Sequence, residues 1–411
     1  MRILHTSDWH LGKTLEGYSR LGEQEQFLGE LISIADEEQV DLILVAGDVY
    51  DGPNPPAPAE RLFYDTVKQL AQNGERAVLV IAGNHDNPDR LMAANPLAYD
   101  HGVIILGKPK SMALTGYYGG FEVEEAGEGY VKISLKGEKA VILTLPYPSE
   151  TRLNEVLSGS YDENIRRESY SKRVGEFWKQ LSGHFGPDTI NIAVSHLYIS
   201  GGIESDSERQ IQLGGSLAVD PEMLPEAQYI ALGHLHRPQK VWGTDKSAYY
   251  SGSPLQYSPS EIHYSKSVYI VDVEPGKDAK VKEKLLHNYK PIEVWECDSI
   301  TQAIQKCTEQ QAGERWIYLN IKTDRVITQA EIKEMKSLRK DILQFNPLLI
   351  KRDEEMETEI EDYRTLKINE LFKAFYRHQR NGAEAPQEII DLFYTITREE
   401  ETEDETYSAK D

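Results

Sequence analysis

The first part of the chain alternates short apolar runs with longer segments in which apolar residues recur every three or four positions. Short apolar runs indicate buried strands, and the periodic segments are typical of amphipathic helices. Strands are expected over residues 2–8, 41–48 and 76–86, and helices over 22–39 and 57–74. Because these strands alternate with helices, the pattern predicts an α/β layer sandwich with buried strands.

After about residue 115 the pattern becomes more β-like. Residues 119–147 suggest hairpins, and a helix is expected near 163–182. Further strands and turns are expected over 189–198, 228–236, 247–254 and 266–276. A Pro-Gly-Lys-Asp turn then predicts that the core domain spans residues 1–275.

Residues 285–350 predict a small separate α+β unit. Its strands are expected over 291–298 and 315–323 and its helices over 299–311 and 328–342, where Thr328 and Glu331 resemble a capping box. Residues 353–398 predict two helices, which either form a hairpin packed on its own domain or dock an apolar face on a partner helix. The acidic tail, 399–411, is predicted to be disordered.

Composition narrows the class of protein. A chain of 411 residues predicts two or three structural units. The formal charge of −23 argues against broad contact with nucleic acid, but not against a local site built around bound cations. Two cysteines without a CxxC spacing fit a reducing compartment, and no apolar run approaches the ~20 residues of a membrane span. A cytoplasmic protein without a signal peptide is the expectation.

Metal-ligating residue types follow five of the expected strands. They are Asp8 and His10, then Asp48, then Asn84, His85 and Asp86, then His196, and last His234 and His236. Ligand sites in α/β sheets form outside the carboxyl ends of strands. A lone HxH pair would not settle whether it binds metal, but five strand ends in register predict one shared site.

The donor types select the class of metal. Carboxylate, imidazole and amide oxygen suit Mn, Fe or Zn, and the absence of thiolate argues against a soft site. Seven ligands are too many for one tetrahedral ion and suit two ions that share a carboxylate, the arrangement used to hydrolyse phosphate esters. Asp48, expected on a central strand, is the candidate for the shared ligand.

The motifs DxH, GD, GNHD, a distant His and GHxH, in this order and spacing, resemble those of the calcineurin-like metallophosphoesterase superfamily over roughly residues 1–275. The resemblance implies a two-sheet β-sandwich flanked by helices, with a small α+β cap domain and C-terminal helices. It implies that Asp8, His10, Asp48 and His236 bind one ion and that Asp48, Asn84, His196 and His234 bind the other.

Two residues of the GNHD motif receive other roles from the resemblance. His85 would lie over the substrate phosphate and protonate the leaving oxygen, and Asp86 would orient His85. An aspartate that only caps the loop is the alternative for Asp86. Lys13 and Arg20 either contact DNA phosphates or belong to a solvated surface.

Within the superfamily the chain is most similar to bacterial DNA-repair nuclease subunits. The similarity implies a manganese-dependent nuclease that acts as a double-strand exonuclease and a single-strand or hairpin endonuclease. It also implies a coiled-coil ATPase as partner, in a heterotetramer of two plus two, with the nuclease subunits paired through their cores. The expected helix over 88–99 is a candidate for that pairing. A metallophosphoesterase for small phosphate esters or nucleotides is the alternative, since it would share the whole metal site.

Overall fold

The computed structural model describes residues 1–154, 163–208, 217–310 and 313–349 and single positions between 372 and 393. Residues Met1–Leu348 form one compact unit, and a second unit begins at Leu349. The predicted helices over 353–398, apart from those single positions, and the predicted disordered tail over 399–411 lie outside the described residues. Of the helices described, none is long and apolar enough to cross a membrane.

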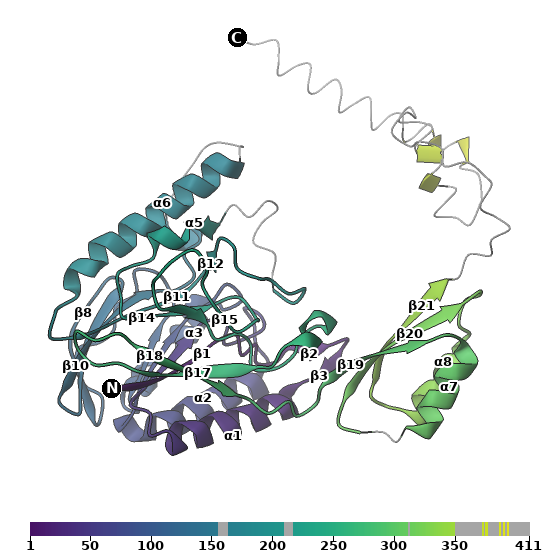
Figure 1. The fold of residues 1–411 in the computed structure, drawn as a ribbon, viewed down its shortest axis with the longest axis horizontal. Coiled ribbons are helices and arrows are strands. Elements are labelled where there is room, and N and C mark those ends of the chain that lie inside the picture. Colours follow the sequence, from purple (N-terminus) through teal and green to yellow (C-terminus); the bar gives the residue numbers. More distant parts are fainter. Residues whose placement is uncertain are drawn as a thin grey trace, which may run out of the picture. The chain divides into compact units, whose positions relative to one another are not determined.

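The first of two large sheets has six strands in the order β18-β17-β1-β4-β5-β6 (Figure 1). Its parallel strands are β1 (Arg2–Thr6), β4 (Leu42–Ala46), β5 (Ala77–Ile81) and β6 (Val103–Leu106). The antiparallel strands β17 (Ser267–Asp272) and β18 (Lys280–Leu285) complete one edge. Parallel strands end at the same edge of a sheet, so the loops after β1, β4 and β5 lie together.

The second sheet has eight strands in the order β15-β16-β14-β11-β10-β9-β8-β7. The strands are β7 (Gly116–Tyr117), β8 (Phe121–Gly127), β9 (Tyr130–Leu135), β10 (Glu138–Leu145), β11 (Ile190–His196), β14 (Tyr229–Gly233), β15 (Gln239–Lys240) and β16 (Ala248–Tyr250). Two-stranded pairs form at the periphery: β2 (Thr14–Leu15) with β3 (Tyr18–Ser19), and β12 (Tyr198–Ile199) with β13 (Ala218–Val219).

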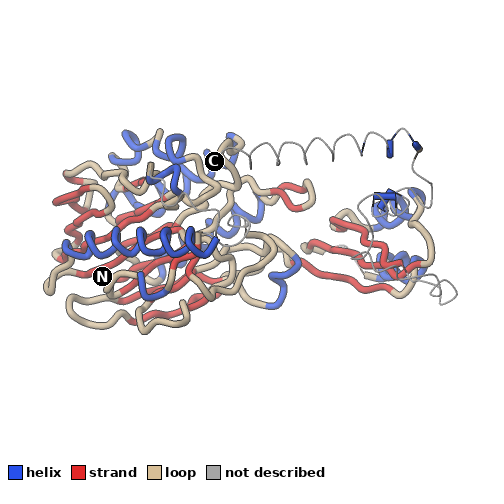
Figure 2. The backbone as a smooth tube through the Cα atoms, turned by 90° about the horizontal axis from the view of Figure 1, so that it is seen from above, coloured by secondary structure: helices blue, strands red, loops and turns tan. Residues whose placement is uncertain are grey.

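The two sheets pack face to face and helices cover their outer faces. One apolar cluster joins the sheets, for example Leu44 with Ile142 and Ile192. A second cluster joins the first sheet to α1 (Leu21–Glu37) and α2 (Ala57–Ala71), and a third joins the second sheet to α6 (Glu163–Leu181). In Figure 1, α6 lies on one side of the strands and α1 and α2 lie on the other, and Figure 2 shows a long helix in front of the strands. The layer sandwich predicted from the sequence is confirmed, as is the implied two-sheet core.

Two expected boundaries differ from the structure. Strand β18 extends the first sheet beyond residue 275, and its mostly exposed sequence KVKEKL has no apolar run that would signal a sheet strand. The expected helix over 88–99 is two short helices, α3 (Pro88–Met92) and α4 (Asn95–Tyr99). Pro96 explains the break, because proline inside a helix removes a hydrogen bond and clashes with the preceding turn.

A three-stranded sheet follows the core, in the order β19-β20-β21. Its elements are β19 (Ile292–Cys297), α7 (Ile300–Glu309), β20 (Trp316–Thr323), α8 (Gln329–Leu338) and β21 (Ile342–Leu349). We call residues 292–349 the cap unit; it has its own apolar cluster. The capping box of Thr328 and Glu331 is confirmed, whereas β21 was not predicted, because Pro347 and exposed positions weaken its strand pattern.

The cap unit contacts the core through an interface of hydrogen bonds and apolar packing. The Trp316 Nε1–H donates to Glu23 Oε1 of α1 over 3.0 Å, and the Trp316 ring packs on Tyr18 at 5.4 Å between centroids. The backbone N–H of Ile292 donates to Gln256 Oε1 over 2.9 Å. Helix α1 therefore carries a direct contact to the cap unit.

Candidate metal centre

The carboxyl ends of five strands from both sheets meet at one place. Strands β1, β4 and β5 contribute from the first sheet and β11 and β14 from the second. The structure brings together all nine residues singled out from the sequence: Asp8, His10, Asp48, Asn84, His85, Asp86, His196, His234 and His236. Asn84 and His85 are half-buried and the other seven are buried.

One side of the site is formed by Asp8, His10 and His236, whose ligand atoms all lie within 4.8 Å of one another. The Nε2 atoms of His10 and His236 are 3.0 Å apart, and His10 Nε2 is 3.7 Å from Asp48 Oδ2. Two imidazole nitrogens this close must share a proton or a cation.

The other side is formed around Asp48 and His196, which are 3.4 Å apart between Oδ2 and Nε2. The side-chain oxygen of Asn84 is 2.8 Å from His196 Nε2 and 3.1 Å from His234 Nδ1. Asp48 lies within 4 Å of imidazole nitrogens on both sides and is therefore the central carboxylate of the site.

Four of these residues have a backbone conformation that is rare outside glycine. Asp8, His10 and Asp48 have φ values of 54°, 45° and 48°, and His234 has 108°. Each such residue costs about 1–3 kcal/mol and persists only where its surroundings impose it. Hydrogen bonds between neighbouring loops do so: the N–H of Asp8 donates to the Gly47 carbonyl and that of His10 to the Asp48 carbonyl, both over 3.0 Å.

Three glycines allow the strand ends to approach one another. A Cβ atom at Gly83 would lie 2.1 Å from Asp48 Oδ1, one at Gly47 2.3 Å from His196 Nδ1, and one at Gly233 1.9 Å from the Ala46 carbonyl oxygen. Contacts below 3.0 Å are not tolerated. Any side chain at these positions would therefore displace a residue of the site or the strand beside it.

This close approach gives a paired prediction. Gly83→Ala is expected to lower the free energy of unfolding by about 1–3 kcal/mol, because overpacking a filled interior forces its neighbours to shift. Gly29→Ala is the matched control: Gly29 lies in α1 with nothing within 4 Å, so the change should raise stability by about 1 kcal/mol. Urea unfolding of both variants tests this, and equal stabilities for the two would contradict the packing described.

Burial and mutual charge set the protonation of the site. Burial raises the pKa of Asp8 to about 6 and lowers the pKa of His234 to about 3. Burial would also raise the pKa of Asp48, but the imidazoles of His196 and His85 outweigh it and hold that pKa well below its usual range. Asp48 in turn raises the pKa of His196 to about 9 against the effect of burial.

The donor set fits divalent metal ions. The converging atoms are carboxylate oxygens, imidazole nitrogens and one amide oxygen, and both cysteines are buried in the cap unit. Such hard and borderline donors suit Mn, Fe or Zn.

His85 and Asp86 point in different directions. The Nδ1 of His85 is 2.7 Å from the Asp51 carbonyl oxygen, and its Nε2 is 4.0 Å from Asp48 Oδ2. The Asp86 carboxylate instead accepts the backbone N–H groups of Val49, Tyr50 and Gly83 over 3.1, 2.9 and 2.8 Å. These contacts are those of the loop-capping alternative for Asp86, while its role in orienting His85 stays a prediction.

Comparison with known proteins adds the family. A model described as "Calcineurin-like phosphoesterase" matches residues 1–238, and one described as "Type 5 capsule protein repressor C-terminal domain" matches 288–380. The chain is 41% identical over 406 residues to the SbcD subunit of the nuclease SbcCD of Bacillus subtilis (strain 168), covering 98% of this chain and 100% of that one. The chain belongs to the SbcD family.

Two further relatives are also SbcD subunits of SbcCD nucleases. The one from Rhodobacter capsulatus is 37% identical over 285 residues, or 67% of each chain. The one from Escherichia coli (strain K12) is 29% identical over 413 residues, covering 96% of this chain and 97% of that one. The similarity therefore extends through the cap unit and beyond it.

Several residues of this SbcD-family site were not predicted from the sequence. Asp51 Oδ1 lies 3.6 Å from His10 Nδ1. The same oxygen accepts a hydrogen bond from Lys13 Nζ over 2.8 Å, so Lys13 is paired with Asp51. Its position three residues after Asp48 could have indicated it. Arg152 donates to the carbonyls of Gly83 and Asp86 over 2.7 and 2.6 Å, and no local pattern signals this contact.

Arg20 also differs from both interpretations offered for it. Its side chain is 1% exposed, bonded to Glu23 over 2.6 Å and to the Gln256 carbonyl over 2.7 Å. A buried, paired guanidinium neither meets solvent nor reaches a DNA phosphate. The burial of Arg20 depends on its contact with Gln256, more than 200 residues away in the chain, which no local sequence pattern signals.

Proposed function

We propose that this chain is a metal-dependent DNA nuclease that hydrolyses phosphodiester bonds as part of an SbcCD complex. The observation that carries the proposal is the convergence of seven metal-ligating side chains from five strand ends in a chain of the SbcD family. The finer activity that we propose is double-strand exonuclease and single-strand or hairpin endonuclease action in DNA repair and recombination.

Two divalent ions, Mn²⁺ by preference, are proposed to occupy the site. Asp8, His10, Asp48 and His236 would hold the first and Asp48, Asn84, His196 and His234 the second; the close distances around Asp48 support its shared role. When bound, such ions supply a water nucleophile at neutral pH and neutralise charge on the phosphate. Mg²⁺, Fe²⁺ and Zn²⁺ accept the same donor types.

His85 is the proposed general acid. Its Nδ1–H donates to the Asp51 carbonyl, which leaves Nε2 to carry the mobile proton. The side chain is 12% exposed at the edge of the site, with its ring 4.7 Å from that of His10. This placement lets Nε2 reach the leaving oxygen of a phosphodiester while Asp51 fixes the orientation of the ring.

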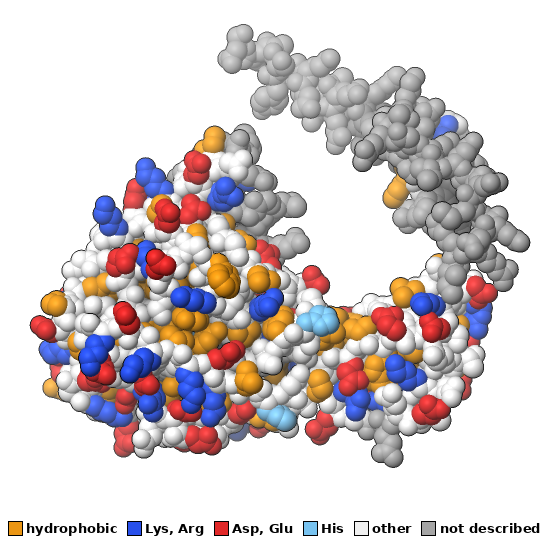
Figure 3. Space-filling model, in the orientation of Figure 1, with side chains coloured by type: hydrophobic (Ala, Val, Ile, Leu, Met, Phe, Trp, Pro, Cys, Tyr) orange, Lys and Arg blue, Asp and Glu red, His pale blue; other side chains and the backbone are white. Residues whose placement is uncertain are grey.

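The alternative function, hydrolysis of small phosphate esters or nucleotides, would use the same metal site. The cap unit favours the nuclease function, because an enzyme for small substrates does not need such an additional unit joined to the core beside α1. On the face shown in Figure 3, basic and acidic side chains are interspersed and form no single basic surface. We therefore expect the isolated chain to bind DNA weakly and the partner to supply basic surface.

The proposed partner is an SbcC-type coiled-coil ATPase in a heterotetramer of two plus two, bound by the predicted helices over 353–398. Among the few residues described there, the Phe372 and Phe393 rings stack at 4.1 Å between centroids.

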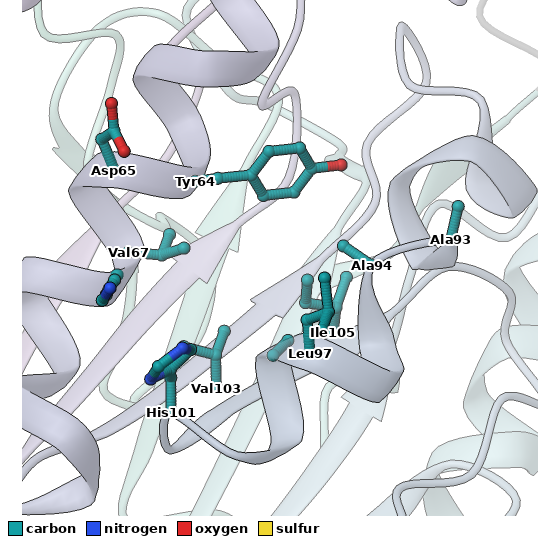
Figure 4. Close-up of a pocket in the computed structure, with 11 residues that line it drawn as sticks. Tyr64, Asp65, Val67, Ala93, Ala94, Leu97, His101, Val103 and Ile105 are labelled. Carbon is teal, nitrogen blue, oxygen red and sulfur yellow. The ribbon is translucent and has the colours of Figure 1, made fainter.

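The nuclease subunits are proposed to pair through α3 and α4, where Leu97 is 72% exposed beside an apolar cavity of about 430 Å³ (Figure 4). Buried free cysteines fit the proposed cytoplasmic, nucleoid-associated location.

Circular single-stranded DNA tests the function, because a circle has no ends and its cutting reports endonuclease chemistry. The purified chain with Mn²⁺ is expected to cut the circle and to leave a phosphate monoester intact, and EDTA should abolish cutting. Hydrolysis of the monoester alone would favour the alternative function. If neither substrate reacts, adding an SbcC-type ATPase and ATP must restore cutting for the proposal to stand.

A further inference from the structure

A polar network lies behind His236, on the side away from the other ligand candidates. The Ser207 hydroxyl contacts both His236 Nδ1 and Glu261 Oε1, and these two atoms are 3.4 Å apart. Glu208 Oε1 accepts the backbone N–H of His236 over 2.7 Å. Neither the motifs nor the proposed chemistry accounts for this network.

A fully buried ion pair anchors the network. Glu261 is 0% exposed, and its second oxygen accepts from Lys266 Nζ and from the Tyr257 N–H. Lys266 Nζ also donates to the His236 carbonyl over 3.0 Å and to Ser253 Oγ over 2.8 Å. Because the Lys266 ammonium and the Tyr257 N–H both donate to this one oxygen, Glu261 acts in the network as a charged acceptor paired with Lys266.

The hydrogen-bond directions fix the tautomer of His236. An ionised Glu261 accepts only, so the single Ser207 proton is donated to Glu261. The Ser207 oxygen must then accept from His236, which places a proton on Nδ1. In the neutral imidazole, the form that can bind a metal, the lone pair then lies on Nε2, the atom that faces His10 Nε2 at 3.0 Å.

We propose that Ser207 and Glu261 are positioning residues for His236, holding its Nδ1–H so that Nε2 presents its lone pair to a metal ion. The inference rests on the proposed metal site and adds two residues to it. A ligating histidine commonly donates its other N–H to a partner that fixes the ring, and loss of such a partner costs about 10–100-fold in metal affinity. Here the partner is the Ser207 hydroxyl, which is itself hydrogen-bonded to the buried Glu261 carboxylate. Ser207 lies 29 residues before His236 in the chain, and Glu261 lies 25 residues after it.

Calorimetric titration of Mn²⁺ into the metal-free full chain tests the proposal. Ser207→Ala is expected to weaken one of two Mn²⁺ sites by about 10–100-fold and to leave the other unchanged. Ser207→Thr keeps the hydroxyl and is expected to restore the affinity. Wild-type affinity at both sites in Ser207→Ala would overturn the proposal.

Ser253→Ala is the matched control. Ser253 is buried and contacts Lys266 of the same ion pair, but its own hydroxyl donates to the Leu255 carbonyl over 2.9 Å and not to His236. This variant is expected to lower the melting temperature while both Mn²⁺ affinities stay unchanged. An equal loss of Mn²⁺ affinity in Ser253→Ala would contradict the proposal, because the network would then only support the local fold. A wild-type chain that binds no divalent ion would instead contradict the proposed metal site.

Discussion

Asp48→Asn is expected to lower Mn²⁺-dependent DNA cleavage by at least about 10³-fold, since a two-ion site loses its shared charge. The side chain keeps its size and loses only its charge. A single atom, Oδ2, lies 3.7 Å from His10 Nε2 and 3.4 Å from His196 Nε2, so the change affects both sides of the site. Cleavage of circular single-stranded DNA measures the loss.

Thermal unfolding gives Asp48→Asn a second measurement that does not depend on activity. A ligand that binds only the folded state stabilises it by about 2.7 kcal/mol at 100 times its Kd. Mn²⁺ should therefore raise the melting temperature of the wild-type chain and raise that of the variant much less. Asp278→Asn, an exposed carboxylate in the turn before β18, is the control and should behave as wild type. An unchanged Mn²⁺ response in Asp48→Asn would contradict the shared-ligand role.

His85→Ala is expected to lower DNA cleavage by about 10²–10⁴-fold, the usual contribution of a general acid. The Mn²⁺-induced rise in melting temperature should be unchanged, because His85 is not among the proposed ligands. In the structure His85 Nδ1 is 2.7 Å from the Asp51 carbonyl oxygen, and Nε2 is 4.0 Å from Asp48 Oδ2. The two variants therefore separate metal binding from proton transfer.

A substrate with a better leaving group than DNA tests whether His85 acts by donating a proton. A nitrophenolate leaves without a proton, so His85→Ala should lose much less activity on bis(nitrophenyl) phosphate than on DNA. His287→Ala is the control, since His287 is exposed on the loop after β18. Equal losses on both substrates would show that His85 contributes binding or charge rather than a proton.

The sequence pattern predicted those elements whose formation depends on residues close together in the chain. The buried parallel strands β1, β4 and β5 and the helices α1 and α2 follow from side-chain periodicity, which depends on neighbours in the sequence. The capping box of Thr328 and Glu331 was likewise visible, because both of its hydrogen bonds join residues three apart. Strands β18 and β21 were missed because exposed edges and a proline leave no such pattern.

The sequence by itself determined which residue types stand at five strand ends, and therefore that one shared metal site was expected. Only the tertiary structure decided how those ends meet: two sheets, rather than one, bring Asp48 to within 3.4 Å of His196. It alone decided that Asp86 caps a loop, that Arg20 is buried, and that Ser207 and Glu261 hold His236. The reason is that these contacts depend on side-chain direction and on packing between distant segments, which strand and helix periodicity does not encode.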